Sequence, residues 1–217
     1  MSKELIIIGA GGDGRNVADV VRDLSDDWKL LGFLDDDPAK QGKEINGVRV
    51  LGKIDNLEKY RGCYFTILVG TAGRVKSKKN LIAKLGLKPD EYATIIHPSA
   101  KISPSASIGK GTVILPMVTV MANAYLGDFV FVASKTNIGH DAKIFDYTLL
   151  SAMVGIAGGV TVREGAYIGI SSCIREGINV GEWSIVGIGS VVVKDVKPYT
   201  IVAGNPAKSI GKADTEE

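Results

Sequence analysis

Hydrophobic residues recur every six positions through the second half of the chain. Starting at Ile96, every sixth residue is aliphatic without a gap as far as Val192. These positions are Ile96, Ile102, Ile108, Ile114, Val120, Leu126, Val132, Ile138, Ile144, Leu150, Ile156, Val162, Ile168, Ile174, Val180, Val186 and Val192. An unbroken short repeat is the signature of a solenoid, and a period of six predicts a β-helix. We therefore expect these side chains to point into one continuous core.

A second position of the repeat, four residues after each aliphatic one, is also restricted and mostly small. It holds Ala100, Ala106, Thr112, Val118, Ala124, Val130, Thr136, Ala142, Thr148, Val154, Val160, Ala166, Ser172, Ile178, Ser184 and Ser190. Glycine directly follows the aliphatic residue at Gly109, Gly127, Gly139, Gly169, Gly181 and Gly187. Glycine adopts backbone angles that strain other residues. We expect the small residues and glycines to form the corners of the coil.

The first ninety residues follow a different pattern, in which short apolar runs alternate with helical spacing. The pattern predicts strands at 5–8, 29–34, 48–51 and 65–69, and helices at 16–24 and 77–85. Alternating strands and helices indicate a parallel sheet. We expect an α/β half-Rossmann, nucleotide-binding domain over residues 1–90 and a parallel β-helix domain over residues 91–217.

Composition and charge exclude several classes of protein. The chain has 217 residues, and its 26 Lys and Arg against 24 Asp and Glu leave a net charge of +2. Nucleic-acid binding requires clustered cations, so we expect no nucleic-acid partner. The densest basic run, at Lys76, Lys78 and Lys79, is predicted to be a solvated helix face. The 27 glycines, about 12% of the chain against a usual ~7%, fit a fold with many turns.

The cysteines and the apolar runs predict a cytoplasmic protein. Cys63 and Cys173 have no metal-binding or redox spacing, and we expect both to be small buried residues in a reducing compartment. No stretch approaches the ~18 apolar residues that cross a bilayer, so no membrane partner is expected. The first apolar run, at 5–8, is too short for a signal peptide.

One of the two histidines is a candidate for proton transfer. Histidine is the usual general base near neutral pH. His97 precedes Pro98 where the repeat begins, which favours a structural role. His140 follows Gly139 near a corner and points outward, either as an exposed corner histidine or as a base. The next residue, Asp141, could hold its tautomer, provided that a local bend turns the two side chains together.

The hexads resemble the left-handed β-helix of the hexapeptide-repeat acyltransferases. That resemblance implies a left-handed coil with three hexads, or 18 residues, per turn. Residue 158 would then stack on His140, and Ala122 would lie on its other side. Gly158 and Gly159 form either a plain corner or an open lane for a thioester arm, with an amide available to its carbonyl.

A glycine-rich turn follows the first predicted strand. Gly9, Gly11 and Gly14 match G-x-G-x-x-G between a strand and a helix, which aims helix amides at phosphate. Asp35, about 20 residues on, stands where a ribose-binding carboxylate would lie, although a turn before Pro38 explains it equally well. The pattern alone predicts NAD. We reject NAD because the second nucleotide-binding half is missing and the β-helix supplies a different chemistry.

Taken in order, the motifs resemble those of the bacterial nucleotide-sugar N-acetyltransferases of the PglD/NeuD type, which include the sialic acid O-acetyltransferases. The resemblance covers nearly the whole chain. It depends on the segments 8–15, 32–38, 96–100, 139–141 and 203–208.

The resemblance implies roles for particular residues. His140 would be the general base on the acceptor and Asp141 would polarise it. Acetyl-CoA, the co-substrate, would lie between neighbouring β-helices of a homotrimer, with the Gly158 amide at the thioester carbonyl. Further acetyl-CoA contacts would come from Ile170, Gly187, Ile188, Asn205, Pro206 and Lys208. The nucleotide-sugar substrate would contact Gly11, Gly12, Asp13, Gly14, Arg15, Asp35 and Asp36. Relatives often carry Asn and His where this chain has Ala133 and Leu149.

We therefore expect an enzyme that transfers acetyl from acetyl-CoA to the amino group of a UDP-, GDP- or dTDP-linked 4-amino sugar, without a metal, in surface polysaccharide or glycan biosynthesis. One alternative is O-acetylation of a sugar of the sialic acid type, and another is a non-catalytic module that binds nucleotide-sugars. A γ-type carbonic anhydrase needs three zinc-ligand histidines, and the chain has two in total.

Overall fold

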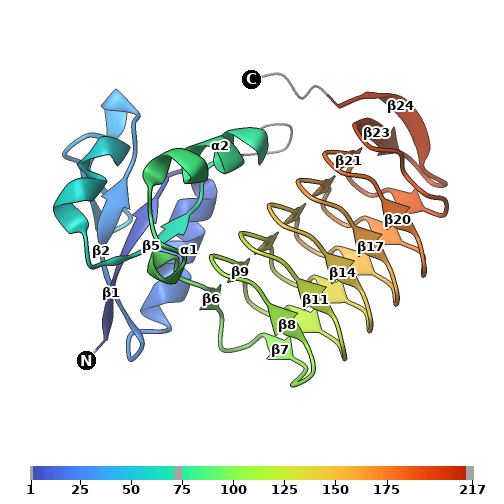
Figure 1. Cartoon of the computed structure of the whole chain (residues 1–217), viewed down its shortest axis with the longest axis horizontal. Helices are drawn as coiled ribbons and strands as arrows, with labels where there is room; N and C mark the ends of the chain where they lie inside the picture. Colours follow the sequence, from blue (N-terminus) through green and yellow to red (C-terminus); the bar gives the residue numbers. More distant parts are fainter. Residues whose placement is uncertain (1, 71–74, 214–217) are drawn as a thin grey trace.

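Residues 95–212 form a parallel β-helix with three faces (Figure 1). The computed structural model describes residues 2–70 and 75–213. The first face contains β6 (Ile95–Ile96), β9 (Val113–Ile114), β12 (Phe131–Val132), β15 (Leu149–Leu150), β18 (Tyr167–Ile168), β21 (Ile185–Val186), β23 (Thr200–Ala203) and the antiparallel β24 (Lys208–Lys212). The second face contains β7 (Lys101–Ile102), β10 (Thr119–Val120), β13 (Asn137–Ile138), β16 (Gly155–Ile156), β19 (Cys173–Ile174) and β22 (Val191–Val192). The third face contains β8 (Ser107–Ile108), β11 (Tyr125–Leu126), β14 (Lys143–Ile144), β17 (Thr161–Val162) and β20 (Asn179–Val180).

Three edges join these faces. The first edge joins the first and second faces at 115–118, 133–136, 151–154, 169–172 and 187–190. The second edge joins the second and third faces at 121–124, 139–142, 157–160 and 175–178. The third edge joins the third and first faces at 109–112, 127–130, 145–148, 163–166 and 181–184. Through β22, paired strands are 18 residues apart, as Thr119 and Asn137 illustrate, so each edge carries residues at that spacing.

The predicted core is confirmed. From Ile114 to Val192 every aliphatic position of the repeat is buried, while Ile96, Ile102 and Ile108 at the start of the helix are partly buried. Threonine and serine at the second repeat position are buried because their hydroxyls bind backbone carbonyls at the corners. For example, Thr136 Oγ1 donates to the Ser151 carbonyl at 2.8 Å. These bonds satisfy polar groups that would otherwise be costly inside the core.

The role predicted for the glycines that follow the aliphatic residues is wrong. The positive φ angles of the corners fall two residues later in each hexad, as at Asp141 with φ of 58°. Gly139 is required for another reason, because a Cβ there would lie 2.7 Å from the backbone of Ala157 in the next coil. These glycines permit close stacking of coils rather than a strained backbone angle.

The N-terminal part is an α/β domain with the sheet order β3-β4-β2-β1-β5. Its parallel strands are β1 (Lys3–Ile8), β2 (Trp28–Leu34), β4 (Val48–Gly52) and β5 (Tyr64–Ile67), and its helices are α1 (Gly12–Arg22) and α2 (Val75–Leu85). Three short 3₁₀ helices lie at η1 (Pro38–Lys40), η2 (Ile54–Tyr60) and η3 (Pro89–Glu91). The four predicted strands and both helices are present. However, α1 begins four residues earlier than predicted, because the glycine turn lacks helical hydrophobic spacing. The short β3 (Glu44–Ile45), which pairs antiparallel with β4, was not predicted.

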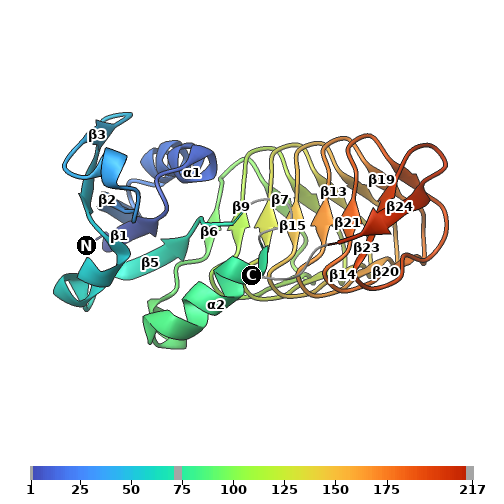
Figure 2. The same ribbon diagram turned by 90° about the horizontal axis from the view of Figure 1, so that it is seen from above.

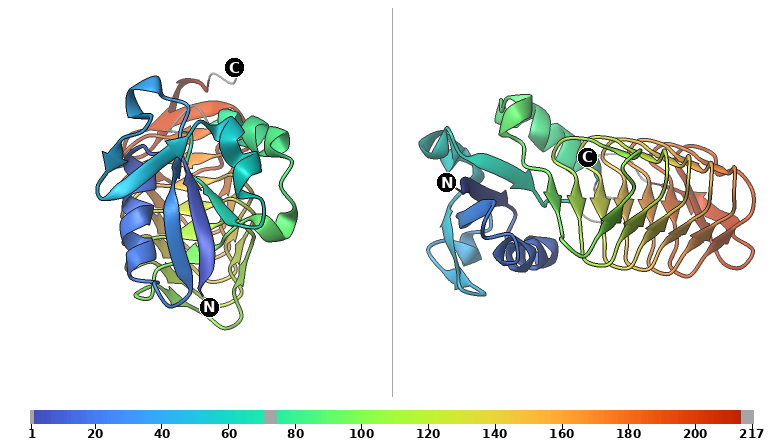
Figure 3. Two further views of the ribbon diagram at one scale, coloured as in Figure 1. Left: turned by 90° about the vertical axis from the view of Figure 1, so that its left-hand side faces the viewer. Right: turned by 90° about the horizontal axis from the view of Figure 1, so that it is seen from below.

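The α/β domain stands at the end of the β-helix where the coils begin, and α2 lies alongside the coils (Figures 2 and 3). Apolar residues of both parts share one buried cluster, in which Val17 and Phe33 join Leu115 and Phe131. On the third edge, Lys79 of α2 forms an ion pair with Glu164 at 2.5 Å. Among the described residues, no helix combines the length and apolar content that a bilayer crossing requires.

Candidate active site

The glycine-rich turn joins β1 to α1 and leaves the start of the helix open. Gly14 packs directly on the turn, since a Cβ there would lie 1.9 Å from the Gly9 carbonyl oxygen. Gly11 and Gly12 face open space, and Gly11 caps α1 without a side-chain hydrogen bond. Arg15 is exposed on the first turn. The unpaired amides at this helix start suit an anionic group.

Asp35 and Asp36 follow β2 and hold the backbone around this turn. The buried Asp35 carboxylate accepts from the Ala10 amide at 2.7 Å, from the Asp37 amide at 2.9 Å and from the Lys40 ammonium at 2.9 Å. Burial raises the pKa of Asp35, but these hydrogen bonds outweigh burial and leave the pKa below its usual value. Asp36 is exposed and accepts from the Ile54 amide at 2.9 Å. Asp35 thus connects the end of β2 to the glycine turn, and Asp36 keeps one carboxylate oxygen for other contacts.

His140 and Asp141 form a hydrogen-bonded pair on the second edge. The positive φ of Asp141 turns its side chain beside that of His140, and His140 Nδ1 lies 2.7 Å from Asp141 Oδ2. Asn123, one coil earlier, donates to the other carboxylate oxygen at 3.1 Å. Hydrogen bonds from His140 and then Asn123 lower the pKa of Asp141, so it remains a carboxylate at neutral pH. His140 is exposed, and its Nε2 stays available to a substrate.

Gly158 lies against the imidazole of His140. A Cβ at Gly158 would lie 2.6 Å from His140 Cε1 and Nε2. The space beside Gly158 therefore holds the histidine ring, whereas the sequence suggested a lane for the ligand. Within residues 2–70 and 75–213 the Gly158 amide has no hydrogen-bond partner, so it can donate to an oxygen beside His140 Nε2.

The remaining acyl-site candidates lie on another part of the β-helix. Ile170, Gly187 and Ile188 follow the first edge, and Ala203 packs on Gly187 one coil further on. Ile188 is 71% exposed. Asn205, Pro206 and Lys208 continue from Ala203 through the turn between β23 and β24. One chain brings His140, Asp141 and Gly158 together, but it separates them from these first-edge residues by the width of the second face.

A groove of about 970 Å³ connects the glycine turn with the first edge. Asp13 and Asn16 line one end and Ile170 lines the other. Ser151 and Tyr167, between them, share a hydrogen bond of 3.1 Å. Sequence reasoning missed these two residues and Asn123. Counting 18 residues back from Asp141 would have found Asn123, whereas nothing in the repeat marks Ser151 or Tyr167.

Two surface predictions are wrong. Cys63 is buried as expected, but Cys173 points outward from β19 and is exposed. Lys78 belongs to the run predicted as a solvated face, yet only 7% of it is exposed, because α2 packs this side against the β-helix. The described parts of the chain contain no group of three or more His, Cys, Asp or Glu side chains arranged to hold a metal ion.

Known proteins share both the sequence and the fold. Residues 4–85 match the family model of the PglD N-terminal domain. The acetyltransferase domain of PglB from Neisseria gonorrhoeae is 32% identical, with a TM-score of 0.86 over 96% of this chain and 100% of that one. PerB from Caulobacter crescentus, solved with CoA and GDP-perosamine, is 28% identical, with a TM-score of 0.85 over 96% of this chain and 97% of that one.

A curated relative, UDP-N-acetylbacillosamine N-acetyltransferase of Bacillus subtilis, is 35% identical over 115 residues. That match spans 51% of this chain and half the length of the relative.

The fold and the histidine at an open corner of the coil define a hexapeptide-repeat acyltransferase. A Rossmann-like domain followed by a left-handed parallel β-helix is the fold class expected from the sequence, and it is confirmed. The chain belongs to the family of PglD-type sugar N-acetyltransferases.

Proposed function

We propose that this protein transfers the acetyl group of acetyl-CoA to the amino group of a nucleotide-linked 4-amino sugar. The observation that carries the proposal is the pair formed by His140 and Asp141, with Nδ1 and Oδ2 2.7 Å apart beside the unpaired amide of Gly158. Two relatives support the choice of substrates, since PerB was solved with CoA and GDP-perosamine and the PglB domain with acetyl coenzyme A. The nucleotide would be UDP, GDP or dTDP.

The chemistry follows from which histidine nitrogen is free. The sugar amine attacks the acetyl carbonyl carbon, and His140 Nε2 accepts the proton that the amine loses. Asp141 keeps the remaining ring proton on Nδ1 and stabilises the imidazolium. The Gly158 amide donates to the oxyanion, which collapses as the carbon–sulfur bond breaks. The proton passes from His140 to the departing sulfur, which leaves as CoA thiol.

The glycine turn would bind the nucleotide-sugar. Gly11 and Gly12 leave space for a diphosphate at the start of α1, and the exposed Arg15 lies on the same turn. Asp36 would contact the nucleoside, while Asp35 acts mainly through the Ala10 amide that it holds. Asp13 lies at the turn end of the groove that leads towards Ile170, and the sugar would occupy that groove.

A complete site would require a second copy of the chain, and we propose a homotrimer. His140 lies on the second edge and the exposed Ile170 and Ile188 lie on the first edge, so one thioester arm would contact both only between neighbouring molecules. Exposed methionines also occur on both edges, at Met117 and Met153 on the first and Met121 on the second. Contact of a first edge with a second edge is a head-to-tail interface, which closes into a ring.

Replacing His140 with Ala tests the proposed base. We expect the rate of CoA thiol release, kcat, to fall by ~10²–10⁴ while acetyl-CoA binding is retained. The matched control is His97→Ala, because His97 contacts Asp23 and Ser99 far from the second edge and should leave the rate nearly unchanged. A full rate in His140→Ala would overturn the assignment. Assays of UDP-, GDP- and dTDP-linked amino sugars alongside sialic acids distinguish amine from hydroxyl acceptors.

A further inference from the structure

Lys78 is a buried lysine at the boundary between the two parts of the molecule. It lies on α2, and its Nζ donates to the Phe129 carbonyl on the third edge at 2.9 Å. The neighbouring Lys79 behaves as a surface residue and pairs with Glu164. Lys78 therefore holds one coil of the β-helix against the α/β domain through a bond that solvent hardly reaches.

The charges that face Lys78 come from two other elements. Burial lowers the pKa of Lys78 to about 8, and the carboxylate of Asp13 on α1 opposes that shift. Burial raises the pKa of Asp13, and Lys78 opposes that shift in turn. Tyr147 on the third edge is the other titratable neighbour, and burial raises its pKa, so it remains neutral when Lys78 titrates. Each of the two buried charges thus depends on the other.

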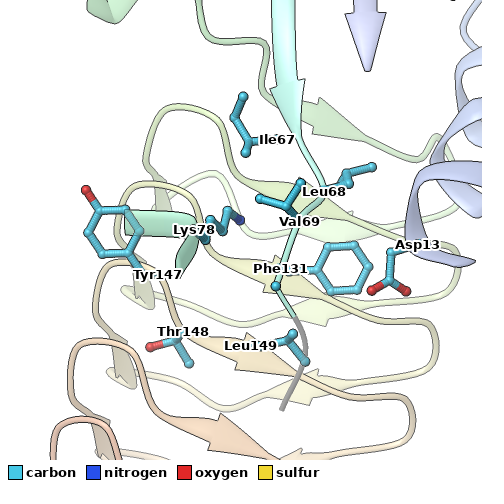
Figure 4. A pocket seen from close by; sticks show the side chains of 10 residues that line it. Asp13, Ile67, Leu68, Val69, Lys78, Phe131, Tyr147, Thr148 and Leu149 are labelled. Atoms are coloured by element: carbon cyan, nitrogen blue, oxygen red, sulfur yellow. The ribbon is translucent and has the colours of Figure 1, made fainter. Parts of the chain in front are cut away.

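Asp13 and Lys78 line one pocket of about 330 Å³ (Figure 4). The side chain of Phe131 projects into the same pocket from the first face. Phe131 and Asp13 also line the groove that runs to Ile170. The Lys78 bond to the Phe129 carbonyl therefore fixes a coil segment whose next outward side chain, Phe131, forms a wall of the groove.

We infer that Lys78 is a positioning residue for the nucleotide-linked sugar, because its ammonium fixes the 129–131 segment relative to the glycine turn and so sets the shape of the groove. The inference rests on the proposed function. Loss of the proton weakens the bond to Phe129 and leaves the buried Asp13 carboxylate without a cation. Binding of the sugar should therefore weaken as the pH rises through about 8.

Kinetics of three variants test the inference. In Lys78→Met we expect the KM for the nucleotide-linked amino sugar to rise about tenfold at pH 7, the scale of one charge-assisted hydrogen bond, with the KM for acetyl-CoA within twofold of wild type. Lys84→Met, an exposed lysine of the same helix, should match wild type. Between pH 7.5 and 9.5 the sugar KM should rise in wild type and stay flat in Lys78→Arg, since arginine keeps its charge.

Amide hydrogen exchange of the 129–132 segment gives a readout that needs no activity. Exchange should be faster in Lys78→Met than in wild type or Lys84→Met. An unchanged exchange rate, an unchanged sugar KM, or a wild-type pH dependence in Lys78→Arg would each overturn the inference. If wild type acetylates no nucleotide-linked amino sugar, the proposed function fails, and the exchange comparison still decides whether Lys78 fixes the segment.

Discussion

At the scale of single residues, the candidate site is built from backbone conformation as much as from side chains. The positive φ of Asp141 allows two consecutive residues to hydrogen-bond through their side chains, and the missing Cβ of Gly158 gives the imidazole its place. Asn123 completes the arrangement by holding the second carboxylate oxygen of Asp141. The orientation of His140 therefore depends on residues from three successive coils.

Gly158→Ala should displace the ring without unfolding the protein. The new Cβ would lie 2.6 Å from His140 Nε2, so the imidazole must move and kcat should fall by about 10²-fold. Gly155→Ala is the matched control in the same coil, since its Cβ would meet only Cys173 Sγ at 3.5 Å. Rates of thiol release and melting temperatures of both variants check the prediction. Equal kcat values for the two would show that the Gly158 contact does not position His140.

At the scale of the element, one strand of two residues divides its side chains between core and solvent. In β14 the side chain of Lys143 is exposed and that of Ile144 is fully buried. Because the same division repeats along all three faces, the core is a column of aliphatic side chains with few long-range alternatives. Each coil thus depends on its own inward residues and on its neighbours.

Ile144→Ala should destabilise the β-helix much more than Lys143→Ala. Removing a fully buried isoleucine side chain costs about 2–5 kcal/mol, since the rigid stack cannot close over the cavity. The exposed Lys143 should change the free energy of unfolding by about 0.5 kcal/mol or less. Denaturant unfolding of both variants measures the difference. Similar losses for the two would contradict the inward and outward assignment.

At the scale of the whole molecule, the two groups of acyl-site candidates lie on different edges of one β-helix. His140 and Gly158 belong to the second edge, whereas Ile170 and Ile188 belong to the first. This separation makes the proposed trimer a functional requirement, because a neighbouring copy would supply the missing edge. Within one chain, the groove from Asp13 to Ile170 connects the proposed nucleotide-sugar end with the first edge.

Hybrid trimers test this arrangement directly. His140→Ala removes the base, and Ile188→Asp places a charge on the exposed first edge; each variant alone should be nearly inactive. Co-expressed in equal amounts, they should recover about a quarter of the wild-type sites, because some neighbours then combine an intact histidine with an intact first edge. The same variants purified separately and mixed without unfolding serve as the control. No recovery after co-expression would indicate that each site is formed within one chain.

The sequence by itself determined the β-helix, its register and the candidate base. An inward aliphatic residue at every sixth position permits one stacking only, since a shift of one residue would expose the whole core. The same counting placed Gly158 beside His140. Local patterns also predicted the parallel strands of the α/β domain, because each buried strand is a short apolar run.

Only the tertiary structure decided how these parts meet. Lys78 has the sequence context of a surface lysine, and its burial follows from the packing of α2 on the third edge. The glycines after the aliphatic positions serve the approach of the next coil, a contact that local sequence does not contain. The division of the acyl-site candidates between two edges likewise appears only in three dimensions. A repeat specifies which residues stack, but contacts between separate elements depend on shapes and distances that no local pattern records.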